Sequence, residues 1–195
     1  MIARFAKITI LFGGLGILAH QLWLLIRVAR NGRVLRKPKS WQQRLGVVTV
    51  TLAFVAVVLL IFDTGNLSLN ESWWSDFIRL VGLFCFIGGI FFRVWAIRSL
   101  ENLLSPDLRI TDRIHLITHG AYGVVRHPFY LSALLLLLGA GLALINIVLL
   151  GCLLPLWLIL QQRIRLEEKM LAEYFGEAHT VYRQTVPALV PKLNR

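Results

Sequence analysis

The sequence has little cysteine, and the two cysteines that it does have are isolated. Cys85 and Cys152 both lie inside apolar segments. Neither shows the paired spacing that a disulfide framework or a cysteine metal centre requires. We therefore interpret them as packing residues, and we expect no metal site.

Acidic residues are also scarce. The chain has 10 Asp and Glu residues against 21 Lys and Arg residues, which gives a formal net charge of +11. Such a charge indicates nucleic-acid binding when the basic residues gather on one folded face. Here they are spread over short segments between apolar blocks, a pattern typical of contact with anionic lipid headgroups. We expect anionic lipids as partners and no nucleic acid.

Apolar residues, by contrast, are abundant. They make up 57% of the chain, and the mean hydropathy is +0.69, above the usual range of soluble domains. A helix that crosses a bilayer needs about 20 apolar residues. Four blocks meet or nearly meet this length: Phe5–Val28, Leu45–Phe62, Phe77–Ile97 and Phe129–Leu160.

The last of these blocks is too long for one crossing. Asn146 interrupts it near its middle, so we interpret it as a tight helical hairpin. The sequence thus predicts an all-α integral membrane protein with about five transmembrane helices and a single domain, residues 1–195. Residues 1–97 supply three N-terminal crossings. Residues 98–195 supply a loop, the hairpin and a C-terminal amphipathic helix.

The connections between the blocks differ in charge, and this difference predicts orientation. Short cytoplasmic loops retain Lys and Arg. The first connection is rich in these residues, whereas the second is acidic until Arg79. We expect the N-terminus outside, as a crossing retained without cleavage, and the C-terminus in the cytoplasm. The membrane would be a plasma or inner membrane or the endoplasmic reticulum, depending on the organism.

A polar segment, His119–Tyr130, runs directly into the longest apolar block. An anchor would not need this crowding of histidine, arginine and tyrosine at the edge of a membrane. Gly120 and Gly123 permit positive φ or close backbone approach. Pro128 suits the first turn of a helix, whose free amide groups can hold a carboxylate. Taken singly, each of these residues also has an ordinary structural explanation.

A second polar cluster follows the same apolar block. Arg163 and Glu167 are four residues apart and share one helix face. An apolar stripe at helical spacing continues to Phe175, and Gly176 is a suitable helix stop. In a hairpin, this cluster would lie beside residues 128–130 at the cytoplasmic face. We therefore predict one site built from both clusters.

These residues resemble the C-terminal signature of isoprenylcysteine carboxyl methyltransferases. The signature is Tyr122-x-x-x-Arg126-His127-Pro128-x-Tyr130, then Arg163-x-x-x-Glu167-Glu168 and Phe175-Gly176. The resemblance covers about Arg98 to Pro191. It extends more loosely to phospholipid N-methyltransferases and to sterol reductases. It implies S-adenosyl-L-methionine as cofactor and the carboxylate of a prenylated cysteine, or a similar lipid-modified acid, as methyl acceptor.

Carried over by position, the resemblance implies a set of cofactor-binding residues and one catalytic, substrate-binding residue, Arg163. Two positions depart from the pattern: Leu108 stands where some members have glutamine, and Ser132 where glycine is frequent. The implied cofactor contacts are His115, Leu116, Ile117, Thr118, Tyr122, His127, Pro128, Phe129, Tyr130 and Glu167.

The chemistry of methyl transfer suits these residue types. A sulfonium methyl group is already electrophilic and a carboxylate already ionised, so the reaction needs alignment and dehydration rather than a general base. The planar fork of Arg163 can hold a carboxylate. The alternatives are phospholipid N-methylation, reduction of a sterol-like lipid with NADPH, and a non-enzymatic membrane adaptor. We expect a monomer that admits its acceptor from the bilayer.

Overall fold

The computed structural model describes residues 2–30, 73–100 and 116–190, and these residues form helices and no strand. The all-helical prediction is confirmed for this part of the chain. The predicted block Leu45–Phe62 lies outside it. The long helices are α1 (Ile2–Arg30), α3 (Trp73–Leu100), α5 (Pro128–Leu144) and α7 (Leu153–Phe175), and the short ones are α4 (Ala121–Val124), α6 (Ile147–Gly151) and α8 (Glu177–Thr185).

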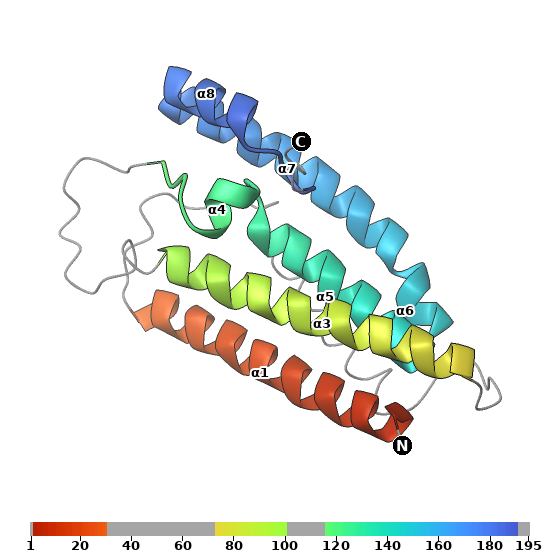
Figure 1. The fold of residues 1–195 in the computed structure, drawn as a ribbon. Helices are drawn as coiled ribbons and strands as arrows, with labels where there is room; N and C mark the ends of the chain where they lie inside the picture. The colour runs from red at the N-terminus through yellow and green to blue at the C-terminus, as the bar shows by residue number, and fades with distance from the viewer. Residues whose placement is uncertain (1, 31–72, 101–115, 191–195) are drawn as a thin grey trace.

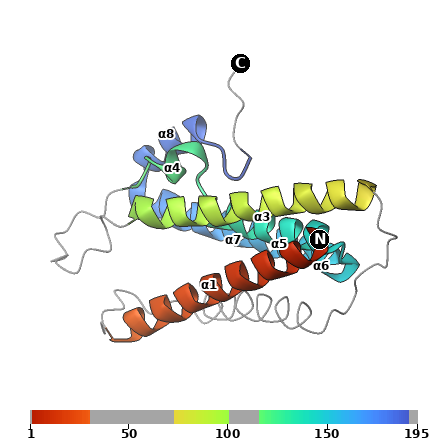
Figure 2. The same ribbon diagram turned by 60° about the horizontal axis from the view of Figure 1, so that its bottom comes forward.

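The long helices lie side by side in the order α1, α3, α5 and α7 (Figure 1). Helix α1 packs on both α3 and α5, and α7 packs on α5. The short helices α4 and α8 lie together at the end where α3 stops and α5 begins (Figure 2). This end of the bundle carries the residues that the sequence singled out.

Helices α3 and α5 approach each other unusually closely because glycines face across their contact. A Cβ atom added to Gly82 would lie 2.3 Å from the backbone nitrogen of Ala143, and one added to Gly139 would lie 2.4 Å from that of Phe86. Small residues permit this distance between helix backbones. The buried core around the contact joins α1, α3, α5 and α6 through Ala6, Ile10, Leu83, Phe86, Ala140, Ala143, Leu144 and Leu149.

The apolar run after Pro128 is divided at Ile145 and Asn146. Ile145 adopts a left-handed conformation, with φ of 52°, and the amide of Asn146 donates to the carbonyl oxygen of Gly141 at 2.8 Å. The side-chain oxygen of Asn146 accepts a hydrogen bond from the amide of Leu149 at 3.0 Å and so caps α6. Helices α6 and α7 then run back along α5 (Figure 1).

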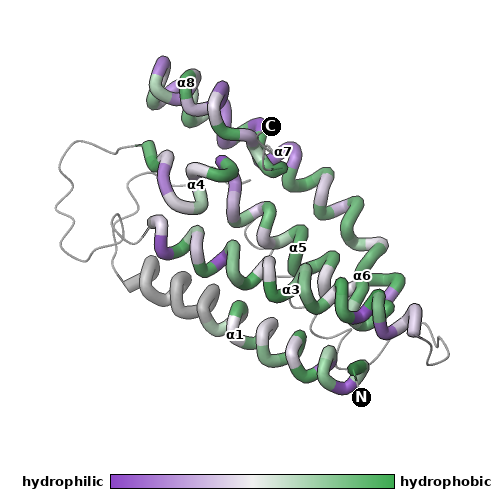
Figure 3. Tube along the Cα trace, in the orientation of Figure 1, coloured by the Kyte–Doolittle hydropathy of each residue, from purple (hydrophilic) through white to green (hydrophobic). Residues whose placement is uncertain are grey.

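Two helical stretches have the length and hydropathy of a membrane span, Trp73–Ser99 and Ile147–Phe175, while α5 is a shorter apolar helix of 17 residues. Large apolar side chains such as Phe84 and Leu154 are exposed on them. Exposed apolar surface of this extent is typical of contact with lipid. Hydrophobic residues fill α5, α6 and the first half of α7, whereas hydrophilic ones gather toward α8 and the second half of α7 (Figure 3).

Candidate active site

The chain enters the site through a bend at Gly120. This residue has a φ of 62°, and an added Cβ atom would lie 2.3 Å from the Ser99 hydroxyl oxygen. The same hydroxyl oxygen accepts a hydrogen bond from the amide of Ala121 at 3.1 Å, which ties the start of α4 to the end of α3. Gly120 thus adopts the positive φ that a glycine permits at this position. Among the described glycines, Gly123 is not one of those with positive φ.

His127 and Pro128 form the start of α5, as the sequence predicts: His127 is the N-terminal capping residue and Pro128 lies in the first turn. A segment far along the chain holds this start in place. The amide of His127 donates to the carbonyl oxygen of Ala188 at 3.0 Å, and that of Arg126 donates to Pro187 at 2.9 Å. The residues after α8 therefore pair with the residues that precede α5.

Glu167 is the point where the two polar clusters meet. Its carboxylate accepts a hydrogen bond from the Tyr130 hydroxyl group and another from the Nε of Arg163, the latter at 3.1 Å. The Nδ1 of His127 lies 3.6 Å from the second carboxylate oxygen. The guanidinium carbon of Arg163 also lies 5.5 Å from the centre of the Tyr130 ring, within the range of cation–π attraction.

Glu168, the next residue, belongs to a second and more buried set of contacts. Its carboxylate pairs with Arg126 at two points, 2.8 Å to Nε and 3.1 Å to Nη2, and it lies 2.9 Å from the Nε2 of His127. The imidazole of His127 is therefore held between two carboxylates. Its ring stacks on that of Tyr130, with 5.5 Å between the centres. These contacts fix the orientation of His127.

Helix α8 covers the Glu168 side of the site. The Nε2 of His179 lies 3.8 Å from a Glu168 carboxylate oxygen, and burial lowers the pKa of this histidine. The Tyr182 hydroxyl group donates to the backbone oxygen of Tyr122 at 2.6 Å, and burial raises the pKa of Tyr182 to about 12. Burial raises the pKa of Tyr122 as well. Both phenols therefore stay neutral at physiological pH.

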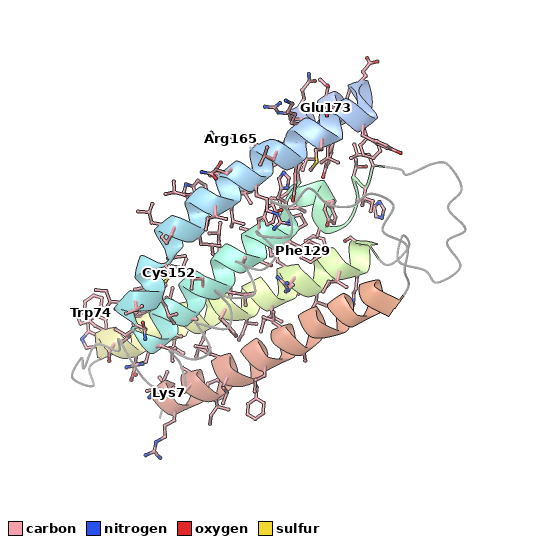
Figure 4. The ribbon with its side chains drawn as sticks, turned by 180° about the vertical axis from the view of Figure 1, so that it is seen from behind. Lys7, Trp74, Phe129, Cys152, Arg165 and Glu173 are labelled. Atoms are coloured by element: carbon pink, nitrogen blue, oxygen red, sulfur yellow. The ribbon has the colours of Figure 1, made fainter. Side chains whose placement is uncertain are left out.

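The remaining implied cofactor residues are not all gathered around Glu167. Leu116, Ile117 and Thr118 precede the bend at Gly120, and their contribution stays a prediction. Phe129 lies at the start of α5 on the side of α3 (Figure 4), where the guanidinium carbon of Arg93 is 5.6 Å from its ring centre. His115 and Leu108 lie outside the described residues.

Ser132 is the small residue at the position where the resemblance favours glycine. It is fully buried, and its hydroxyl group donates to the backbone oxygen of Phe129 at 2.8 Å. The departure from glycine is thus accommodated, because the hydroxyl group finds a partner within the same helix. In the ranges that the structure describes, no group of three or more His, Cys, Asp or Glu side chains could hold a metal ion.

Reasoning from the sequence assigned no role to four residues that the structure places around His127. Two of them have a recognisable signal, since Arg126 directly precedes His127 and Glu168 directly follows Glu167. The other two, His179 and Tyr182, have none, because only the turn after Gly176 brings α8 back against α4.

Comparison with known protein families identifies the family of this chain. Residues 77–178, just over half of the chain, match the family model for phospholipid methyltransferase. The chain belongs to the phospholipid methyltransferase family. The matched residues include both carboxylates and both arginines around His127 and Tyr130, so the site described here lies almost entirely inside the family region.

Several named proteins are similar to this chain at 28–40% sequence identity. Protein-S-isoprenylcysteine O-methyltransferase B of Arabidopsis thaliana is 33% identical over 65% of this chain and 64% of its own length. The protein-S-isoprenylcysteine O-methyltransferase of Schizosaccharomyces pombe is 40% identical over 50% of this chain and 41% of its own length. A nickel-cobalt-cadmium resistance protein of Alcaligenes xylosoxydans xylosoxydans is 28% identical over 78% of this chain and 67% of its own length.

The matches with the isoprenylcysteine enzymes cover less than two thirds of those proteins. The shared part spans 64% of the Arabidopsis enzyme and 41% of the Schizosaccharomyces enzyme. The spacing of the polar residues predicted a resemblance to isoprenylcysteine methyltransferases. These matches confirm that resemblance and the family.

Proposed function

We propose that this protein is an S-adenosyl-L-methionine-dependent membrane methyltransferase that methylates the carboxylate of a prenylated cysteine or a similar lipid-modified acid. The observation that carries the proposal is the convergence on Glu167 of Tyr130, Arg163 and His127. The similarity to proteins named isoprenylcysteine O-methyltransferases supports the acceptor.

The residues around Glu167 fit the chemical groups of the proposed cofactor. The Glu167 carboxylate can accept hydrogen bonds from an amino group or a ribose hydroxyl group. The faces of Tyr130 and Tyr122 can attract a sulfonium cation by about 0.5–2 kcal/mol or stack on adenine. When bound, the cofactor would supply an electrophilic methyl group. His127, Pro128 and Phe129 would contact it at the start of α5, with residues 115–118 as a further edge of the site.

The chain itself would orient the reactants and exclude water. A carboxylate acceptor is already ionised at neutral pH, so no side chain has to remove a proton from it. Arg163 is half-buried, and its Nε lies 3.1 Å from Glu167. A guanidinium group that remains paired on one edge can still donate to a carboxylate from its other edge. Arg163 is thus the proposed catalytic and substrate-binding residue.

The proposed topology has five crossings, with α5 and the helix formed by α6 and α7 as an antiparallel pair. The N-terminus would lie outside, and the polar end of the bundle in the cytoplasm, where the cofactor is available. The acceptor would enter from the bilayer, along the apolar helices. The protein would act as a single-domain monomer in contact with anionic lipids.

The direct test uses the purified protein in lipid nanodiscs with a cofactor carrying a labelled methyl group. N-acetyl-S-farnesylcysteine is the acid acceptor and phosphatidylethanolamine the amine acceptor. We expect label in a base-labile methyl ester of the acid. Transfer to the amine alone, with activity retained after Arg163→Ala, would instead assign phospholipid N-methylation.

Binding of the cofactor product separates a methyltransferase from a reductase or an adaptor. Isothermal titration with S-adenosylhomocysteine should show saturable binding, and titration with NADPH should show none. Binding of NADPH without S-adenosylhomocysteine would assign a reductase. Absence of both would leave the polar clusters with a structural role and reject the proposal.

A further inference from the structure

Arg93 is a cation in an apolar helix that the proposed function leaves unused. It lies in α3, within the stretch that has the length and hydropathy of a membrane span. Its Nε atom is buried and has no hydrogen-bond partner among the residues that the structure describes. A charged group in such surroundings is costly, and inside membrane proteins it marks a functional site or a partner.

The position of Arg93 links it to the site on the other side of α5. Its guanidinium carbon lies 5.6 Å from the centre of the Phe129 ring, and Phe129 directly precedes Tyr130. Successive residues on a helix point about 100° apart, so Phe129 and Tyr130 present their rings to different neighbours. Each ring carries one arginine, Arg93 on the α3 side and Arg163 on the α7 side.

The arginines near these rings differ in whether a carboxylate already compensates their charge. Arg163 pairs with Glu167, and Arg126 with Glu168 at two points. No described carboxylate lies within ion-pair distance of Arg93. A guanidinium group binds a carboxylate through two parallel hydrogen bonds. Among the arginines that touch the site's aromatic and acidic residues, Arg93 thus differs from Arg163 and Arg126 in having no described carboxylate partner.

The depth of Arg93 matches an acceptor that comes from the lipid. It precedes Ser99 by six residues, or about 9 Å along the helix, and Ser99 marks the bend at Gly120 where the polar end begins. Arg93 therefore lies within the apolar part of α3 and not at its polar end. An anion that is part of a membrane lipid can reach this depth, whereas a water-soluble anion would have to leave the aqueous phase.

We propose that Arg93 binds the carboxylate of the lipid-like methyl acceptor, beside Phe129 and on the α3 side of α5. The proposal rests on the proposed function and deepens it, because it gives the acceptor's anionic group a cationic contact on the α3 side of α5 before that group reaches Arg163 on the α7 side. Arg93 is then a substrate-binding residue that discriminates an acid from a neutral lipid of the same shape. Binding forms no covalent bond, and Arg163 remains paired with Glu167 while the acceptor enters.

The experiment measures binding rather than turnover. N-acetyl-S-farnesylcysteine and its carboxamide are titrated into the full-length protein in nanodiscs of neutral lipid, so that no lipid anion competes. Arg93→Met should weaken binding of the acid by about tenfold or more and leave binding of the amide within about twofold. Arg98→Met is the matched control, because Arg98 is an exposed arginine on the same helix, and it should change neither.

Three outcomes decide against the proposal. Equal weakening of acid and amide would mean that Arg93 affects binding through packing and not through its charge. Unchanged binding of the acid would mean that Arg93 does not contact it. A loss of S-adenosylhomocysteine binding would assign Arg93 to the carboxylate of the cofactor instead. Thermal melting checks each variant, and Arg93→Gln, which removes the charge but keeps a polar hydrogen-bonding group, replaces Arg93→Met if the latter does not fold.

The binding format also separates this proposal from the proposed function. Binding of the acid that depends on Arg93, without any methyl transfer from labelled cofactor, would support the acid site and reject the methyltransferase. Methyl transfer to the acid with equal discrimination by wild type and Arg93→Met would support the methyltransferase and reject the role of Arg93.

Discussion

Arg126 and Glu168 form a two-point ion pair between the segment that precedes α5 and the second half of α7. The Nε and Nη2 atoms of Arg126 lie 2.8 and 3.1 Å from the two carboxylate oxygens, and the side chains are 9% and 11% exposed. Arg126 also donates to the backbone oxygens of Arg183 and Val186. One guanidinium group thus ties together three segments that surround His127.

Removal of Arg126 should be strongly destabilising. Arg126→Met leaves the buried Glu168 carboxylate without its main partner, and we expect a loss of about 3 kcal/mol in the free energy of unfolding. The double variant with Glu168→Gln should be no worse than the more damaging single variant, because both remove the same interaction. Denaturant unfolding in detergent measures these values.

Arg165→Met provides the control, since Arg165 is an exposed arginine on the outer face of α7 (Figure 4). We expect a change below about 0.5 kcal/mol there. Strict additivity of the two single variants would contradict a direct pair.

Glu167 should control cofactor binding with little effect on folding. Glu167→Gln keeps the shape of the side chain but removes the negative charge of the carboxylate that accepts hydrogen bonds from Tyr130 and Arg163. We expect S-adenosylhomocysteine to bind about tenfold more weakly or worse, since charge-assisted hydrogen bonds are among the strong ones. Titration calorimetry measures the change, with the exposed Glu173 in Glu173→Gln as the control. Equal affinity of Glu167→Gln and wild type would remove Glu167 from the cofactor site.

The glycine contact between α3 and α5 should tolerate no side chain. A Cβ atom on Gly139 would lie 2.4 Å from a backbone nitrogen of α3, so Gly139→Ala forces the helices apart and should cost about 1–3 kcal/mol. Gly88→Ala, in the same helix pair, places its Cβ atom in open space. It should leave stability unchanged or raise it by up to about 1 kcal/mol, because alanine favours the helix. Thermal melting of both variants would be compared; equal melting temperatures would reject the close contact.

His179 should make stability depend on pH in the mildly acidic range. Burial lowers its pKa from the ordinary value of 6.5, although Glu168 acts in the opposite direction and Arg126, Arg183 and His127 act in the same direction as burial. Below pH 6.5 the unfolded chain takes up a proton that the folded chain refuses, so the free energy of unfolding falls as pH falls through this value. The loss for one group is at most about 1.4 kcal/mol per pH unit.

Unfolding at pH 7.5 and at pH 5.5 tests this expectation. His179→Gln should lose less stability between the two values than wild type, because it has no group to protonate. His119→Gln, which changes an exposed histidine, should follow wild type. A His179→Gln variant with the same pH dependence as wild type would show that other groups cause the decline.

Several features of the fold were predictable because their causes are local. Pro128 begins α5, Asn146 caps α6, and Gly176, with φ of 56°, ends α7. Each effect depends on the geometry of one residue and its immediate neighbours. The positive φ of Gly120 belongs to the same class. The spacing of Arg163 and Glu167 likewise fixed their contact, because residues four apart on a helix are neighbours.

Other features could not be predicted because they join segments far apart in the chain. The amides of Arg126 and His127 pair with residues 187 and 188, and Tyr182 reaches Tyr122, although nothing in the local sequence marks either contact. The separation of Phe129 from Tyr130 is a related case. Their spacing sets the angle between the two side chains, but only the packing of α5 between α3 and α7 decides which arginine each of them meets.

The sequence by itself thus determined the helical class, several helix ends and the family, since hydropathy, capping residues and motif spacing are properties of short stretches. The tertiary structure alone decided how the charges from different helices are compensated. Glu168 pairs with Arg126, while Arg93 faces Phe129 without a described carboxylate partner. The reason is physical: the partner of a buried charge is set by which helix faces pack together, and this depends on close contacts such as that of Gly82 and Gly139 with the facing backbone.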